Sequence, residues 1–196
     1  MNQTNYIVLI MALFAISISG CKKNKASDPT PEQPVNAGAG DQENITRIQL
    51  QFIDSAEVNL IKTFSLRDPD GVGKNPPIAD TIKLSSNKTY LVKMTIYDET
   101  KTPAVIVSDE IRTEGNFHRF HYSFKGNAQV KTSITDYDSR IPAQPLGLQL
   151  KIITGTQAGN GLLNINLRHF SNGIEKTGNP VDGEQDILVD FPVVVN

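Results

Sequence analysis

The sequence predicts an all-β protein, an antiparallel immunoglobulin-like β-sandwich of about seven to ten strands, preceded by a signal peptide and a disordered tether. From Ile45 onward, apolar residues recur with a period of two, as in residues 46–52 and 90–96. Turn clusters such as Asp70-Gly71 and Asn172-Gly173 separate these runs at short spacing. Long stretches of alternation broken by turns are typical of antiparallel sheets with one solvated face.

The strand-like runs follow one another along the chain, and no window supports a helix of about 12 residues. The expected strands lie near residues 46–52, 58–66, 78–84, 90–97, 104–111, 117–124, 130–134, 146–152, 163–168 and 187–191. We expect residues 45–196 to form one domain, because about 150 residues can bury a core without disulfides.

The first 44 residues predict an export signal and a linker. Residues 7–19 are an apolar run that is too short to span a bilayer, which takes about 20 residues. The run has the length of a signal-peptide core and ends in Ile18-Ser19-Gly20-Cys21, which resembles the bacterial lipobox. We therefore expect residues 1–20 to be a lipoprotein signal peptide and Cys21 to carry the lipid. Two or more acyl chains anchor a protein stably.

Residues 21–44 are rich in Lys, Asp, Pro, Asn, Ala and Gly, so we expect a flexible linker on the lipid anchor. Lys22, Lys23 and Lys25 follow the cysteine directly. Surface-exported lipoproteins of Bacteroidota-like organisms carry acidic residues at this place. The absence of acids here favours an outer-membrane protein that faces the periplasm.

Composition narrows the classes of partner. The formal net charge of −2 provides no broad positive field, which argues against nucleic acid as a partner. Cys21 is the single cysteine, so neither an internal disulfide nor a thiolate metal cluster can form. We expect the membrane to be a partner through the anchor, together with an outer-membrane transporter or another envelope protein.

His118 and His169 are the candidate nitrogen ligands for a metal ion. Each shares a strand face with apolar residues near a strand end, whereas His121 points to the face opposite His118. A His118–His169 pair across neighbouring strands, completed by an Asp or Glu, would suit zinc or copper. The alternative is that both histidines are strand-end residues bonded to the backbone. We expect no organic cofactor.

Two acidic loops are candidate calcium ligands. Asp68 and Asp70 stand at the first and third positions of a loop whose next residue is glycine. Asp136 and Asp138 repeat half of this pattern. The two loops could share an ion if they met at one end of the sandwich. The alternative is a pair of ordinary turns.

Several blocks of residues resemble a known group of proteins. They are Ile45-Thr46, Asp68-Pro69-Asp70-Gly71-Val72-Gly73, Phe120-His121-Tyr122, Asp136-Tyr137-Asp138-Ser139, Pro145-Leu146-Gly147-Leu148, the run 161–169 and Gly183-Glu184-Gln185-Asp186-Ile187. Together they resemble small lipoproteins of Flavobacteria and related Bacteroidota labelled "type 1 periplasmic binding fold superfamily protein". The resemblance implies lipoprotein character and lineage, and no activity is carried over from it.

The sequence contains no nucleophile elbow, no zinc-protease helix motif and no phosphate-cradling loop, so we expect no enzyme. The leading hypothesis is a non-enzymatic binding or accessory module of an envelope or transporter system. The alternatives are a periplasmic module that binds zinc, copper or calcium, and a structural or adhesive surface domain.

The Cys21→Ser variant tests the anchor. We expect fatty acid on the parent protein by mass spectrometry and none on the variant, because the thiol is the group that accepts the lipid. The parent should fractionate with membranes and the variant should not. If both proteins were processed and fractionated alike, and the parent carried no fatty acid, the anchor would be excluded.

Overall fold

The computed structural model describes residues 44–69, 75–171 and 175–196. The chain divides into two units, Met1–Glu32 and Gln33–Asn196, and all described residues belong to the second. The predicted signal peptide, Cys21, the predicted linker up to residue 43 and Asp70 lie outside the described residues. None of the described helices is both long and apolar enough to cross a bilayer.

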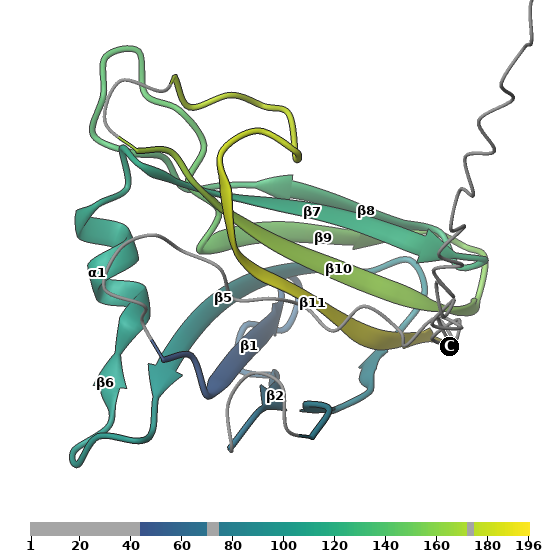
Figure 1. Cartoon of the computed structure of the whole chain (residues 1–196). Coiled ribbons are helices and arrows are strands. Elements are labelled where there is room, and N and C mark those ends of the chain that lie inside the picture. The colour runs from purple at the N-terminus through teal and green to yellow at the C-terminus, as the bar shows by residue number, and fades with distance from the viewer. Residues whose placement is uncertain (1–43, 70–74, 172–174) are drawn as a thin grey trace, which may run out of the picture. The chain divides into compact units, whose positions relative to one another are not determined.

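Two β-sheets make up the described part of the chain, and the prediction of an all-β sandwich is confirmed (Figure 1). The first sheet contains β1 (Arg47–Asp54), β2 (Ile61–Arg67), β3 (Ile78–Ala79), β5 (Thr89–Asp98), β6 (Val105–Ile106), β8 (Val130–Ile134) and β9 (Gln149–Thr154). The second contains β4 (Ile82–Leu84), β7 (His118–Gly126), β10 (Gly159–His169) and β11 (Glu184–Val195). One helix, α1 (Val107–Thr113), is found among the described residues.

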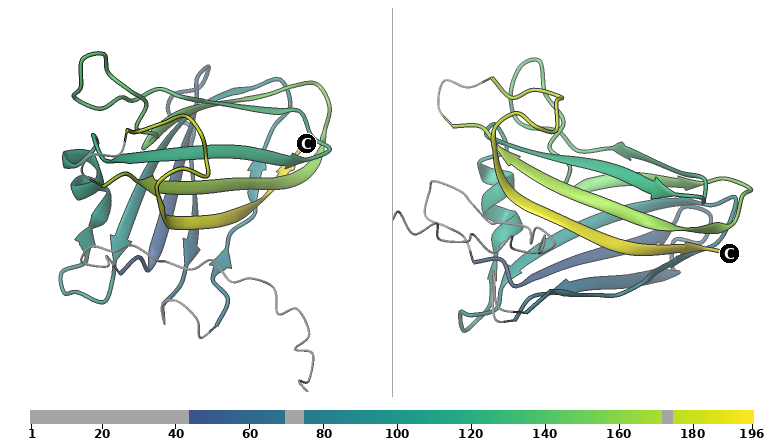
Figure 2. Two further views of the ribbon diagram at one scale, coloured as in Figure 1. Left: turned by 45° about the horizontal axis from the view of Figure 1, so that its top comes forward. Right: turned by 45° about the vertical axis from the view of Figure 1, so that its right-hand side comes forward.

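The strand order places β7 and β8 at sheet edges. The first sheet runs β3-β2-β1-β5-β9-β8, with β6 paired to the end of β5, and the second runs β4-β11-β10-β7. Neighbouring strands are antiparallel except β4 and β11, which are parallel. Figure 2 shows the two layers from two further directions.

Buried side chains that alternate with exposed or half-buried ones along the strands form the core between the sheets. In β1, every second residue is buried, and Leu50 lies opposite Met94 of β5. In the second sheet, Phe120 of β7 lies opposite Leu167 of β10, and both are buried. Burying a side chain of this size contributes about 1.5–3 kcal/mol relative to leaving it exposed. The inward faces of both sheets therefore form one apolar layer.

Two expected strands differ from the structure. Residues 104–111 form only the short β6 and then α1, because Val107 and Ile111 are one helical turn apart and both are buried. Residues 78–84 form β3 in one sheet and β4 in the other, and the backbone N–H of Ser65 donates to the Asp80 carboxylate between them. These short segments bring the described strands to eleven.

Three loops meet at the end of the sandwich beside α1 (Figure 1). They are the turn 114–117 between α1 and β7, the segment 135–148 between β8 and β9, and residues 175–183 before β11. Lys176 joins all three: its Nζ donates to the Gly115 carbonyl and to Asp138 Oδ2, both at 2.9 Å. This end of the sandwich holds the candidate site.

Candidate metal centre

The register of β7 on β10 brings the two candidate histidines together. His118 is the direct antiparallel partner of His169. Their rings stack with centroids 4.8 Å apart and planes 9° apart. Both side chains lie on the inward face of the second sheet, at the end of the apolar layer, as alternation along each strand requires.

A β-bulge adds Asp186 to this pair. Leu167 of β10 pairs with Ile187 of β11, but the next residue, Arg168, pairs with Gln185. Asp186 is therefore the extra residue of the bulge, and a bulge re-aims a side chain next to the site. Oδ2 of Asp186 lies 3.8 Å from Nε2 of His118.

Sequence reasoning missed Asp186 for a specific reason. Strict alternation along β11 places Asp186 on the face opposite Ile187, which is buried in the core. Because of the bulge, the side chain of Asp186 instead lies on the same face as the two histidines. The signal in the sequence is three successive polar residues, 184–186, where the alternation stops.

The three side chains form a compact donor set. One ligand atom from each of His118, His169 and Asp186 can be chosen so that all lie within 4.8 Å of one another. Two ligand atoms of a tetrahedral zinc site lie roughly 3.3 Å apart, because each bond is about 2.0–2.1 Å long. Side-chain rotations that move these atoms by roughly 1 Å would therefore close the set around one ion.

Burial leaves the His118 ring neutral, and a hydrogen bond leaves one of its nitrogens free to bind a metal ion. Its Nδ1 lies 3.1 Å from the Glu114 carbonyl oxygen, which can only accept, so Nδ1 carries the proton and Nε2 keeps its lone pair. Burial, with the charges of His169 and Lys176, lowers the pKa of His118 to about 4. The ring is therefore neutral at neutral pH. A backbone partner on the second nitrogen is the usual orienting contact of a metal-bound histidine.

Asp186 supplies the negative charge of the site. Burial raises the pKa of this carboxyl to about 6, with the Glu184 charge in the same direction and His169 and Arg168 opposing it. Asp186 is then ionised and His118 neutral at neutral pH, so the 3.8 Å contact is not an ion pair. A partly buried carboxylate beside two imidazoles is suited to a divalent cation.

Asp136 and Asp138, two of the predicted calcium ligands, instead accept hydrogen bonds from groups of the protein itself. Asp136 accepts backbone N–H groups of Gly147 at 2.9 Å and Leu148 at 3.0 Å. Asp138 accepts from Lys176, from Arg140 and from the Gln144 backbone. Both carboxylates are thus engaged in holding the segment 135–148.

The structure does not bring Asp68 to these residues. Asp68 follows β2 and Asp136 follows β8, and three strands separate β2 from β8 in the sheet. At about 4.8 Å per strand, the two loops are roughly 19 Å apart. Asp70 lies outside the described residues. The third histidine, His121, lies on the opposite face of β7 from His118.

Lys176 was also missed by sequence reasoning. A lysine in a loop normally reaches solvent, yet the side chains of Lys176 and Asp138 are both fully buried. Burial opposes ionisation of Asp138, but the Gln144 N–H, Lys176 and Arg140 together lower the pKa of its carboxyl to about 2. The pair links the segment 175–183 to the turn that carries the Glu114 carbonyl, and so supports the orientation of His118.

Comparisons of the chain with protein-family models, with curated proteins and with solved structures give no match.

We expect Lys176→Met to destabilise the fold by about 3 kcal/mol, because it leaves the buried Asp138 carboxylate without one of its two cations. Urea unfolding followed by circular dichroism measures the loss. The matched control is Lys93→Met, on an exposed position of β5. A loss below about 0.5 kcal/mol, the range of ordinary surface substitutions, would show that the pair does not hold these loops.

Proposed function

We propose that this protein is a non-enzymatic binding module, anchored to the outer membrane through Cys21, that takes a divalent transition-metal ion at His118, His169 and Asp186. The observation that carries the proposal is the convergence of these three side chains from β7, β10 and β11, with ligand atoms within 4.8 Å. The lipobox-like residues and the resemblance to small lipoproteins support the anchor.

The donor types favour zinc or copper over calcium. Calcium takes oxygen ligands, usually six to eight, whereas imidazole suits zinc and copper. A catalytic-type zinc site has three protein ligands and one open position. Here His118, His169 and Asp186 would be the three protein ligands.

The proposal of binding without catalysis rests on the sequence, which carries none of the common catalytic motifs. We also propose that the module works beside an outer-membrane transporter or another envelope protein on the periplasmic side. A lipid anchor with a flexible linker keeps such a module near the membrane without fixing its orientation.

Isothermal titration calorimetry on the full-length protein in detergent tests the site with zinc, copper and calcium. We expect saturable binding of zinc or copper near one equivalent and no comparable binding of calcium. Asp186→Asn keeps the size of the side chain but removes its charge. It should weaken binding at least about tenfold, the loss that even an outer-shell partner typically causes.

The matched control is Asp190→Asn, at an exposed position of the same strand, which should bind as the parent does. His169→Gln should weaken binding as Asp186→Asn does, whereas His121→Gln, on the other face of the sheet, should leave it unchanged. Flat titrations with both zinc and copper would end the proposal.

A further inference from the structure

The rung next to the histidine pair carries two arginines on the opposite face of the second sheet. Arg119 of β7 is the direct partner of Arg168 of β10. Like charges directly opposite each other destabilise a sheet unless something offsets them. Arg168 donates to the carbonyls of Pro180 and Gly183. In the part of the chain that the structure describes, Nε of Arg119 is buried without a hydrogen-bond partner, and its guanidinium makes no ion pair.

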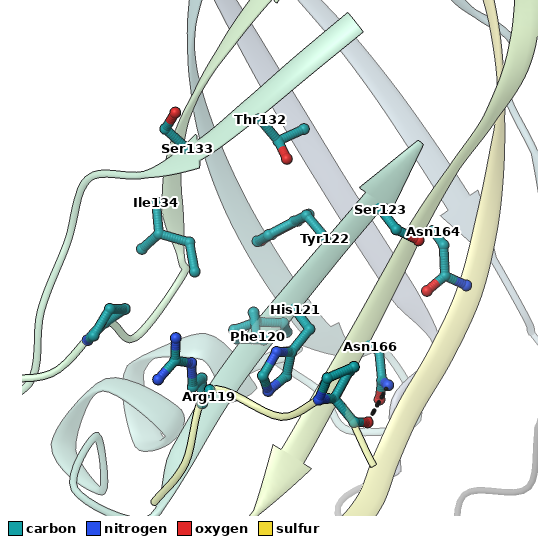
Figure 3. Close-up of a pocket in the computed structure, with 13 residues that line it drawn as sticks. Arg119, Phe120, His121, Tyr122, Ser123, Thr132, Ser133, Ile134, Asn164 and Asn166 are labelled. Carbon is teal, nitrogen blue, oxygen red and sulfur yellow. Dashed lines mark hydrogen bonds between the residues drawn. The ribbon is translucent and has the colours of Figure 1, made fainter. Parts of the chain in front are cut away.

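A groove of about 500 Å³ lies beside Arg119 (Figure 3). Polar and apolar side chains share its wall. The polar ones include His121, two residues after Arg119 on β7, Asn164 and Asn166 from β10, and Thr132 and Ser133 from β8. This volume is typical of small-molecule sites. Arg119 and His121 alternate with His118 along β7, and Asn164 and Asn166 alternate with His169 along β10. These four side chains of the groove therefore lie on the sheet face opposite the candidate metal centre.

Three polar atoms in this wall have no hydrogen-bond partner among residues 44–69, 75–171 and 175–196. They are Nε of Arg119, Nε2 of His121 and Oδ1 of Asn166, and all three are buried. The amide nitrogen of Asn166 does have a partner, the Pro180 carbonyl at 3.1 Å. Buried polar atoms without partners cost free energy, and a group of them around one groove indicates a missing partner.

The charges around the groove favour an anion. Burial and the charges of Arg119 and Arg168 lower the pKa of His121 to about 4, so this ring is neutral at neutral pH. Asp182 is the carboxylate whose charge opposes that effect, and it already accepts from Thr177 at 2.7 Å and Asn179 at 2.9 Å. Among the described residues, no carboxylate pairs with the positive charge of the Arg119 guanidinium.

We propose that this groove binds a small hydroxylated molecule that carries one carboxylate or phosphate group, with Arg119 on the anionic group. A guanidinium recognises both kinds of oxyanion through paired N–H groups. Asn166 Oδ1 can only accept, so it requires a donor such as a ligand hydroxyl. The hydroxyl group of Thr132 can bond a further hydroxyl of the ligand.

Calorimetric titration of the full-length protein in detergent with glucuronate, glucose 6-phosphate and glucose tests the proposal. Saturable binding of glucuronate, of glucose 6-phosphate or of both supports the proposal. The acid that binds more tightly shows whether the site prefers a carboxylate or a phosphate group. Glucose should bind at least about tenfold more weakly, because it lacks the group that Arg119 recognises. Flat titrations with both acids, or equal binding of glucose, would overturn it.

Arg119→Gln should weaken binding of the acid at least about tenfold, and Arg119→Lys should fall between that variant and the parent, because it keeps the charge but loses the paired donors. Arg67→Gln, at an exposed position in the other sheet, is the matched control and should bind as the parent does. A folded Arg119→Gln variant, checked by circular dichroism, that binds the acid as tightly as the parent would contradict the assignment of Arg119.

Discussion

The antiparallel register of β7 on β10 is the constraint on which both candidate sites depend. It pairs His118 with His169 and, one rung along, Arg119 with Arg168. Because successive side chains of a strand alternate between faces, the two rungs serve opposite sides of one sheet. A slip of β7 by one residue would turn His118 and Arg119 over and place Arg119 at the end of the core. The buried Phe120, which pairs with Leu167 on the rung next to the arginines, opposes such a slip, since the slip would expose it.

The bulge in β11 and the buried Lys176–Asp138 pair complete the inward-facing site. The bulge turns Asp186 toward the histidines, and the pair holds the turn from which the Glu114 carbonyl orients His118. Both devices place charge in a partly buried setting. Burial raises the pKa of Asp186, and burial together with the charges of His169 and Lys176 lowers that of His118. With a pKa of about 6, the Asp186 carboxyl is still mostly ionised at neutral pH beside the neutral His118 imidazole, which is the state that a divalent metal requires.

The sequence predicts the all-β class and the shared apolar face of each histidine, because both depend only on alternation along single strands. The pairing of His118 with His169 across β7 and β10 is set by the register. The prediction fails where tertiary contacts decide. Residues 104–111 are predicted as a strand-like run, yet Val107 and Ile111 pack as a helical turn against the sandwich. Asp186 was lost because a bulge is a property of two strands together, and Lys176 because its partners lie 38 and 61 residues away. Asp136 and Asp138 matched a calcium pattern, but their partners are donors that only the fold assembles.

Imidazole ¹⁵N–¹H spectra of the full-length protein test most directly whether the two sites lie on opposite faces of the sheet. The chain has three histidines, and His121 lies on the face opposite His118 and His169. Added zinc should shift the ring signals of His118 and His169 together and leave His121 in place. Added glucuronate or glucose 6-phosphate should shift His121 and leave the other two in place. A zinc response at His121, or at only one member of the His118–His169 pair, would contradict the register and the sites built on it.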